Sequence, residues 1–238
     1  MLTNVPVCVT GVSPKSLGEA LAISIAKRSP ATLILASRTR SKLEEVAELV
    51  RKQCPAIQPN LVVLDLASLK AVRQAAGEIS HLVDHIDILI NNAGVVSSDR
   101  RETADGIEQT FGANHVGHFL FTSLLTPLLL KAAAKFPKAG TTRVVNVTSL
   151  GYRLSPVRFH DYNFEGKEVP VEERPPMKLP SHMIIGKDRP YASFPAYGQS
   201  KTANVLHCVS LNRKLGPKGI KAIAVHPGCR CLRSSCRK

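Results

Sequence analysis

Short, continuously apolar segments alternate with amphipathic helical patterns along most of the chain. The apolar segments fall at residues 5–10, 32–36, 61–64, 86–90, 143–148 and 220–226, and the helical patterns at 17–27, 41–52, 68–83, 103–135 and 196–215. Strands that are apolar throughout are buried on both faces. Repeated strand–helix alternation therefore predicts a parallel sheet with right-handed crossovers and helices on both sides.

This pattern predicts an α/β fold with a doubly wound parallel sheet, that is, a three-layer α/β/α Rossmann fold. All of it fits one domain, residues 1–228, in a chain of 238 residues. Ser41 precedes Glu44 by three positions, which predicts a capping box at the start of the 41–52 helix.

Two segments interrupt the alternation. Residues 154–195 contain seven prolines, and such a long proline-rich connection is typical of a substrate-binding loop inserted into the domain. Residues 229–238 have neither periodicity nor an apolar face, which predicts an unstructured basic tail.

The formal net charge of +14 favours anionic partners such as nucleic acid, an anionic membrane or a phosphorylated cofactor. Only 5% of the residues are aromatic and no nucleic-acid motif is present, so a nucleic-acid-binding module is the weakest of these readings. The long uncharged stretch 111–130 contains Asn114, His115, His118 and Pro127, which indicates a buried helix rather than a transmembrane segment.

The six cysteines do not form a disulfide framework for a chain of this size, so we expect a reducing, cytoplasmic compartment. Three of them, Cys229, Cys231 and Cys236, lie close together near the end of the chain. Their spacing does not match a zinc knuckle, and no metal site is predicted.

The first strand runs into a turn, residues 10–18, that contains Gly11 and Gly18 and leads into a helix. Such a turn lets backbone N–H groups approach a pyrophosphate at the positive end of a helix. An ordinary strand-to-helix loop would look much the same.

The second strand ends at Arg38 with no acidic residue for a ribose hydroxyl, so Arg38, with Lys15, favours the 2′-phosphate of NADP(H). The alternative is that both are solvated surface cations.

Tyr197 and Lys201 are four residues apart and share one face of a predicted helix. A nearby cation stabilises a phenolate and brings a tyrosine pKa toward neutral pH. Ser149 follows a predicted strand at the carboxyl edge of the sheet, where doubly wound sheets bind ligands.

Taken in order, these pieces resemble the short-chain dehydrogenase/reductase family, and within it the retinol-dehydrogenase-like and fungal oxidoreductase-like members. The matching pieces are the turn TGVSPKSLG, Asp65-Leu66, Asn91-Asn92-Ala93-Gly94, Asn114, Thr148-Ser149, Tyr197 to Lys201 and Pro227-Gly228, which together span residues 10–228.

The resemblance implies a role for each matching residue. Tyr197 would be the general acid/base, Lys201 would lower its pKa and bind the nicotinamide ribose, and Ser149 would orient the substrate carbonyl. Asn114 would hold a water that connects Lys201 to solvent. The implied cofactor contacts are Gly11, Ser13, Lys15, Ser16, Leu17, Gly18, Arg38, Asp65, Leu66, Asn91, Asn92, Ala93, Gly94, Tyr197, Lys201, Pro227 and Gly228.

The chain departs from the family pattern in two places. Its turn is one residue longer, and Ser16 stands where the family's middle glycine would allow close approach to the pyrophosphate. After Gly228 the family's last strand and helices are not recognisable, which indicates a truncated or frameshifted ending.

We therefore expect an NADP(H)-dependent oxidoreductase that transfers a hydride between nicotinamide and the carbonyl or alcohol of a small-to-medium hydrophobic substrate. The alternative is a truncated, catalytically impaired family member that at most binds NADP(H). The resemblance also suggests a homo-oligomer formed through the long helices.

Overall fold

The computed structural model describes residues 2–135, 140–176 and 191–228. Six strands form one parallel sheet in the order β3-β2-β1-β4-β5-β6. The strands are β1 (Pro6–Thr10), β2 (Thr32–Ser37), β3 (Asn60–Val63), β4 (Ile88–Asn91), β5 (Thr142–Val147) and β6 (Ile220–Val225). The predicted doubly wound α/β sheet is thus confirmed.

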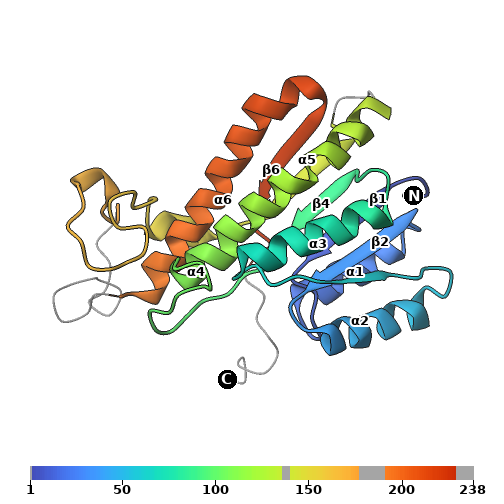
Figure 1. Ribbon diagram of the computed structural model, residues 1–238, viewed down its shortest axis with the longest axis horizontal. Helices are drawn as coiled ribbons and strands as arrows, with labels where there is room; N and C mark the ends of the chain where they lie inside the picture. Colours follow the sequence, from blue (N-terminus) through green and yellow to red (C-terminus); the bar gives the residue numbers. More distant parts are fainter. Residues whose placement is uncertain (1, 136–139, 177–190, 229–238) are drawn as a thin grey trace.

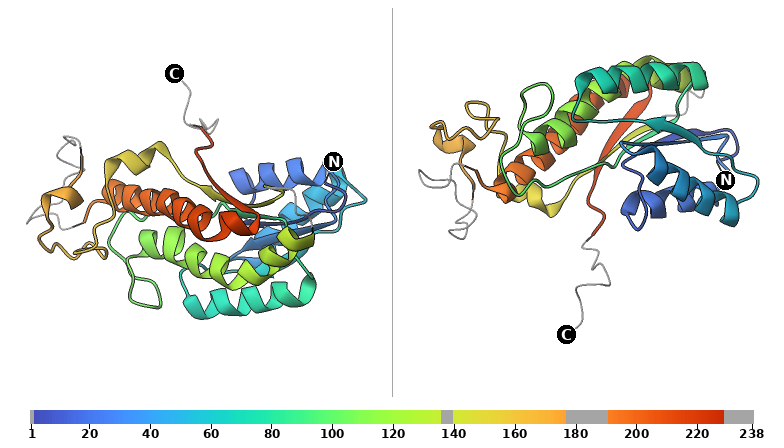
Figure 2. Two further views of the ribbon diagram at one scale, coloured as in Figure 1. Left: turned by 90° about the horizontal axis from the view of Figure 1, so that it is seen from above. Right: turned by 60° about the horizontal axis from the view of Figure 1, so that its bottom comes forward.

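Helices cover both faces of this sheet (Figures 1 and 2). Helices α1 (Leu17–Ala26) and α2 (Arg40–Gln53) pack on one face, through a core that includes Leu33, Leu43 and Val46. On the other face lie α3 (Leu69–Leu82), α5 (Gly117–Lys135) and α6 (Ser193–Leu215). The order of the strands reverses between β1 and β4, and ligands of such sheets bind beyond the strand ends at this point.

The start of α2 differs from the prediction, because the helix begins at Arg40 with Thr39, not Ser41, at its N-cap position. Glu44 accepts a hydrogen bond from Arg40 Nε at 3.0 Å instead of closing a capping box. The second bond of Arg40, to the carbonyl of Leu61 on the edge strand β3, holds it at this position.

The predicted helix 103–135 is shorter than expected, since helical structure begins only with α4 (Gln109–Phe111). Residues 103–106 form a turn in which Gly106 has φ +73° and donates to the carbonyl of Thr103. The carboxylate of Glu108 then caps the helix by accepting from the N–H groups of Thr110 and Phe111. A π-helical segment, Gly112–Val116, connects α4 to α5.

The stretch Gln109–Lys135 is long and apolar enough to cross a membrane by length and composition alone. About half of its apolar window is buried in the structure, where Phe121, Leu125 and Leu129 are fully buried against the sheet. Packing of this kind is typical of a core helix.

On each of the two outer strands, β3 and β6, a polar side chain from a helix forms hydrogen bonds with the strand backbone. Arg40 reaches Leu61 on β3, as described above. On β6, the amide of Asn212 accepts from the N–H of Ala222 at 2.9 Å and donates to its carbonyl at 2.8 Å.

Within the proline-rich segment, the structure describes 154–176 and 191–195. This segment contains a short 3-10 helix, Val171–Glu173. Gln199 of α6 holds the first part of the proline-rich segment by accepting from Arg158 N–H and donating to the carbonyl of Tyr162. The predicted tail 229–238 lies outside the described residues.

Candidate active site

A cleft of about 570 Å³ opens at the carboxyl ends of β1, β2, β4 and β5, where the strand order reverses. It is lined by most of the predicted cofactor residues, namely Gly11, Ser13, Ser16, Leu17, Gly18, Arg38, Asp65, Leu66, Asn92, Ala93, Gly94, Pro227 and Gly228. All four predicted catalytic residues, Asn114, Ser149, Tyr197 and Lys201, also line it. Residues more than 180 positions apart in sequence therefore meet in one cavity.

Two predicted residues do not line the cleft. Asn91 is buried and donates to Thr122 of α5 and to Asn146 of β5, so its side chain joins the end of β4 to a helix and to the neighbouring strand. Lys15 is exposed, and its backbone N–H is bound by the carboxylate of Glu19. Its φ of +57° places it in the left-handed region, which accommodates the additional residue of this turn.

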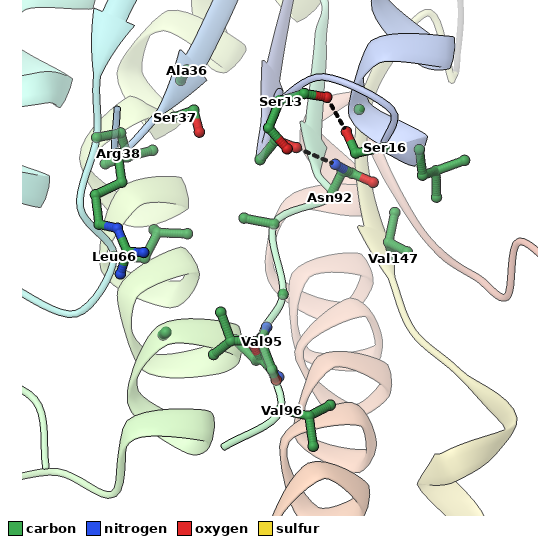
Figure 3. A pocket seen from close by; sticks show the side chains of 18 of the residues that line it. Ser13, Ser16, Ala36, Ser37, Arg38, Leu66, Asn92, Val95, Val96 and Val147 are labelled. Carbon is green, nitrogen blue, oxygen red and sulfur yellow. Dashed lines mark hydrogen bonds between the residues drawn. The ribbon is translucent and has the colours of Figure 1, made fainter. Parts of the chain in front are cut away.

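The turn after β1 brings backbone close to backbone. Gly11 has φ +73°, and a Cβ there would lie 2.4 Å from the Cα of Ala93, so only glycine fits. Ser16 is the N-cap of α1, because its hydroxyl accepts from the N–H of Glu19 and donates to the carbonyl of Ser13 at 2.6 Å (Figure 3). The serine that replaces the family's glycine thus closes the turn.

The amide groups at the start of α1 remain available. Within the described residues, the N–H groups of Leu17 and Gly18 have no hydrogen-bond partner, and both residues line the cleft. Free N–H groups at the positive end of a helix are suited to bind phosphate oxygens.

Two cations stand at the β2 end of the cleft. Arg38 reaches from the end of β2 toward Leu66 (Figure 3), and Lys42 lies in the first turn of α2. Neither forms an ion pair or hydrogen bond with another residue in the described part of the chain. The sequence does not single out Lys42, which belongs to no motif and follows Arg38 across the loop between β2 and α2.

The opposite end of the cleft holds the predicted catalytic residues. A Cβ built on Gly151 would lie 3.1 Å from the ring of Tyr197 and 3.5 Å from Ser149 Oγ, so these two side chains flank the same glycine. The hydroxyl of Ser149 accepts from the N–H of Gly151 at 3.1 Å and keeps its own hydrogen for another acceptor. Lys201 Nζ lies 5.4 Å from the centre of the Tyr197 ring.

Lys201 is nearly inaccessible to solvent, with 3% of its surface exposed. Its ammonium donates to the carbonyl of Val147 at 3.1 Å. Burial lowers the pKa of Lys201 to about 8, because the charged form loses its hydration.

Asn114 has its side chain fully engaged. Its Oδ1 accepts from the N–H of Val95 at 2.7 Å, and its Nδ2 donates to the carbonyl of Val95 and to Ser200 Oγ. Ser200 therefore connects Asn114 to α6 by donating onward to the carbonyl of Tyr197 at 2.7 Å.

Comparison with known proteins agrees with this geometry. The sequence model described as short chain dehydrogenase matches residues 6–163. The chain belongs to the short-chain dehydrogenase family. This assigns it to the oxidoreductases that act on alcohol and carbonyl groups.

Two curated short-chain dehydrogenase relatives are 36% identical to the chain over 222 residues. The oxidoreductase fscI of Fusarium equiseti is matched over 92% of this chain and 85% of its own length. Human retinol dehydrogenase 13 is matched over 93% of this chain but only 58% of its own length. Among solved structures, an uncharacterised protein of Mycobacterium paratuberculosis superposes with a TM-score of 0.72 at 31% identity, covering 95% of this chain and 69% of that one.

Proposed function

We propose that the chain binds NADP(H) in this cleft and transfers a hydride between the nicotinamide and the carbonyl or alcohol carbon of a small-to-medium hydrophobic substrate. The observation that carries the proposal is that Arg38 and Lys42, which have no partner among the described residues, stand at one end of the cleft while Ser149, Tyr197 and Lys201 stand at the other. Free N–H groups of α1 lie between them.

The residues present fit a dinucleotide with a 2′-phosphate. Arg38 and Lys42 provide positive charge beyond the end of β2, and no carboxylate follows that strand directly to bind a ribose hydroxyl. The free N–H groups of Leu17 and Gly18 would bind the pyrophosphate. Asp65 and Leu66 would border the adenine, and Ala93 to Val95 would form the floor beneath the nicotinamide half.

When bound, the nicotinamide supplies the hydride chemistry, and the protein supplies orientation and the proton. In the reductive direction, Ser149 donates a hydrogen bond to the substrate oxygen and Tyr197 delivers its phenolic proton to the same oxygen. Protonated Lys201 stabilises the phenolate that remains on Tyr197. In the oxidative direction the same groups act in reverse.

The substrate end of the cleft supports an apolar substrate. Val95 and Val96 line it and are 38% and 54% exposed, and Leu150, next to Ser149, is 50% exposed. Apolar side chains at the mouth of a cleft favour a hydrophobic substrate.

We further propose that the protein acts in the cytoplasm and that α5 and α6 form contacts between copies. The burial of Cys8 and Cys208 as free thiols suits a reducing compartment. Phe119 on α5 and Leu206 and Val209 on α6 are exposed apolar side chains and provide a surface for self-association.

NADPH and NADH binding to the purified chain, followed by cofactor fluorescence, tests the proposal. The chain contains no tryptophan, so the protein background is low. Saturable binding with NADPH clearly tighter than NADH, together with NADPH oxidation by a panel of apolar aldehydes and ketones, would support it. Binding without turnover would favour the catalytically impaired alternative. Absence of binding to either cofactor would refute the proposed function and leave only an impaired family member whose site is disabled.

The pH profile should report the buried lysine. Because the pKa of Lys201 is lowered to about 8, the ammonium loses its proton above that pH in the free enzyme. Loss of the charge makes Tyr197 a weaker acid, so we expect kcat/KM for carbonyl reduction to be level at lower pH and to fall above about pH 8. Steady-state rates across that range measure it, and a profile that rises through this range would contradict the assignment.

The same group makes a matching contribution to stability. The pKa of Lys201 is lower in the folded chain than in the unfolded chain, so above about pH 8 the unfolded chain binds more protons at this site. The contribution of Lys201 to the free energy of unfolding therefore rises with pH between about 8 and the ordinary lysine pKa of 10.5. Denaturant titrations of the wild type and of Lys201→Met would isolate this contribution, which the variant lacks.

A further inference from the structure

His118 lies in the first turn of α5 and is 2% exposed. Its Nδ1 is 3.0 Å from the carbonyl oxygen of Asn114, and its Nε2 is 2.8 Å from the hydroxyl oxygen of Thr10. A carbonyl oxygen can only accept, so Nδ1 carries the hydrogen and Nε2 of the neutral ring is an acceptor. The other acceptor within reach of the Thr10 hydroxyl, the carbonyl oxygen of Ile90, is farther away at 3.4 Å. Thr10 therefore donates its hydroxyl hydrogen to the nearer acceptor, His118 Nε2.

The ring stays neutral over the working range of pH. Burial and the nearby ammonium of Lys201 lower the pKa of His118 to about 3, against the opposing effect of the hydrogen bond to the carbonyl of Asn114. The groups that face the ring are thus Thr10, the carbonyl of Asn114, Lys201 and the neutral rings of His115 and His207. One tautomer, and one direction of both hydrogen bonds, is fixed by this environment.

Because Thr10 donates its hydroxyl hydrogen to His118, the lone pairs of its oxygen can accept hydrogen bonds from the backbone that forms the floor of the cleft. The N–H groups of Asn92 and Ala93 donate to its hydroxyl oxygen at 3.0 and 3.1 Å. The orientation of this hydroxyl therefore fixes the backbone on which the nicotinamide half of the cofactor would lie.

Asn114 stands on the other side of the ring. It lies in the π-helical segment Gly112–Val116, where the wider turn displaces backbone groups from the ordinary helical pattern. In this segment the carbonyl oxygen of Asn114 accepts from His118 Nδ1. The side chain of Asn114 holds Val95 and, through Ser200, is connected to the carbonyl of Tyr197.

We propose that His118 is a positioning residue that couples two halves of the active site, the cofactor floor held by Thr10 and the catalytic helix held by Asn114. It does not line the cleft, so it acts only through these two partners. The kinetic part of this inference rests on the proposed function, whereas the tautomer and its hydrogen bonds do not.

Two conservative variants separate the two bonds. In His118→Asn the amide nitrogen can occupy the place of Nδ1 and donate to Asn114, but Thr10 loses its acceptor. We expect NADPH affinity to fall about tenfold with kcat nearly unchanged, as for the loss of one buried hydrogen bond. In His118→Gln the terminal oxygen can accept from Thr10, but Asn114 loses its donor. We expect kcat to fall about tenfold with NADPH affinity nearly unchanged.

Leu129→Val, in the same helix and fully buried, is the matched control for simple loss of stability. It should lower the melting temperature and leave both kinetic parameters unchanged well below that temperature. If the Asn and Gln variants affect affinity and kcat alike, or change them no more than Leu129→Val does, the coupling role is refuted. The role would also be refuted if the pH profile of the wild type showed an ionisation near neutral pH that the His118→Gln variant lacks, because this would show that His118 titrates.

Nitrogen NMR of the cofactor-free protein tests the geometry without any activity. We expect a neutral His118 ring with its hydrogen on Nδ1 from about pH 6 to 8, in line with a pKa near 3. A hydrogen on Nε2, or a charged ring, would overturn the inference even in an active enzyme. A wild type that binds no NADPH would instead refute the proposed function, and the NMR result would still decide the inference.

Discussion

Replacing Tyr197 by phenylalanine is expected to lower kcat for carbonyl reduction about 10³-fold, in the range that positioned proton transfer contributes. The substitution removes only the phenolic oxygen. The ring contact with Lys201, 5.4 Å from its centre to Nζ, and the packing of Gly151 against the ring both remain. NADPH affinity and the melting temperature should therefore stay close to those of the wild type.

Single-turnover oxidation of bound NADPH by an excess of aldehyde would measure this effect separately from binding. Tyr191→Phe is a suitable control, because Tyr191 lies just before the same helix and its hydroxyl bonds Glu108 outside the cleft. A Tyr197→Phe variant that retains more than a tenth of wild-type kcat would exclude Tyr197 as the proton donor.

Removing the two cations beyond β2 is expected to abolish the preference for NADPH over NADH. A hydrogen bond to a charged group contributes about 1.5–3 kcal/mol, so Arg38→Ala alone should weaken NADPH binding roughly tenfold to a hundredfold. The double variant with Lys42→Ala should weaken it further, while NADH affinity changes little. Fluorescence titrations of both cofactors at fixed ionic strength measure the ratio.

Lys15→Gly provides the matched charge control. It removes one cation from the same region, relieves the φ of +57°, and leaves the cleft lining untouched. We expect NADPH affinity within about twofold of wild type, since a solvated charge outside a cleft is strongly screened at physiological salt. An equal loss in Lys15→Gly and Arg38→Ala would indicate a general effect of net charge rather than a phosphate site.

Much of the fold could be predicted because apolar periodicity decides it. Every predicted strand is present in the structure, and its bounds differ from the observed ones by no more than two residues. The errors concern local hydrogen bonds that periodicity does not encode. Arg40 binds Leu61, far away in sequence, and so moves the start of α2, and Glu108 caps a helix that the apolar pattern had placed five or six residues earlier.

The lining of the cleft was predictable where residue type and strand ends coincide, as for Tyr197, Lys201, Ser149 and Arg38, whose functional roles stay predictions. It was less predictable where a residue acts through geometry alone. Asn91 and Lys15 matched the family pattern but do not line the cleft, whereas Lys42 lines it without belonging to any motif. The roles of Ser200 and His118 depend on hydrogen bonds across 86 and 108 residues, which no local spacing reveals.

The two polar side chains at the borders of the sheet have a consequence for how the molecule behaves in a crowded solution. The N–H and the carbonyl of Ala222 are both hydrogen-bonded to the Asn212 amide rather than to β5. The carbonyl of Leu61 is likewise hydrogen-bonded to Arg40. A strand from another chain would have to displace these side chains before it could extend the ladder. In the described part of the sheet, these contacts therefore oppose edge-to-edge pairing at Leu61 and at Ala222.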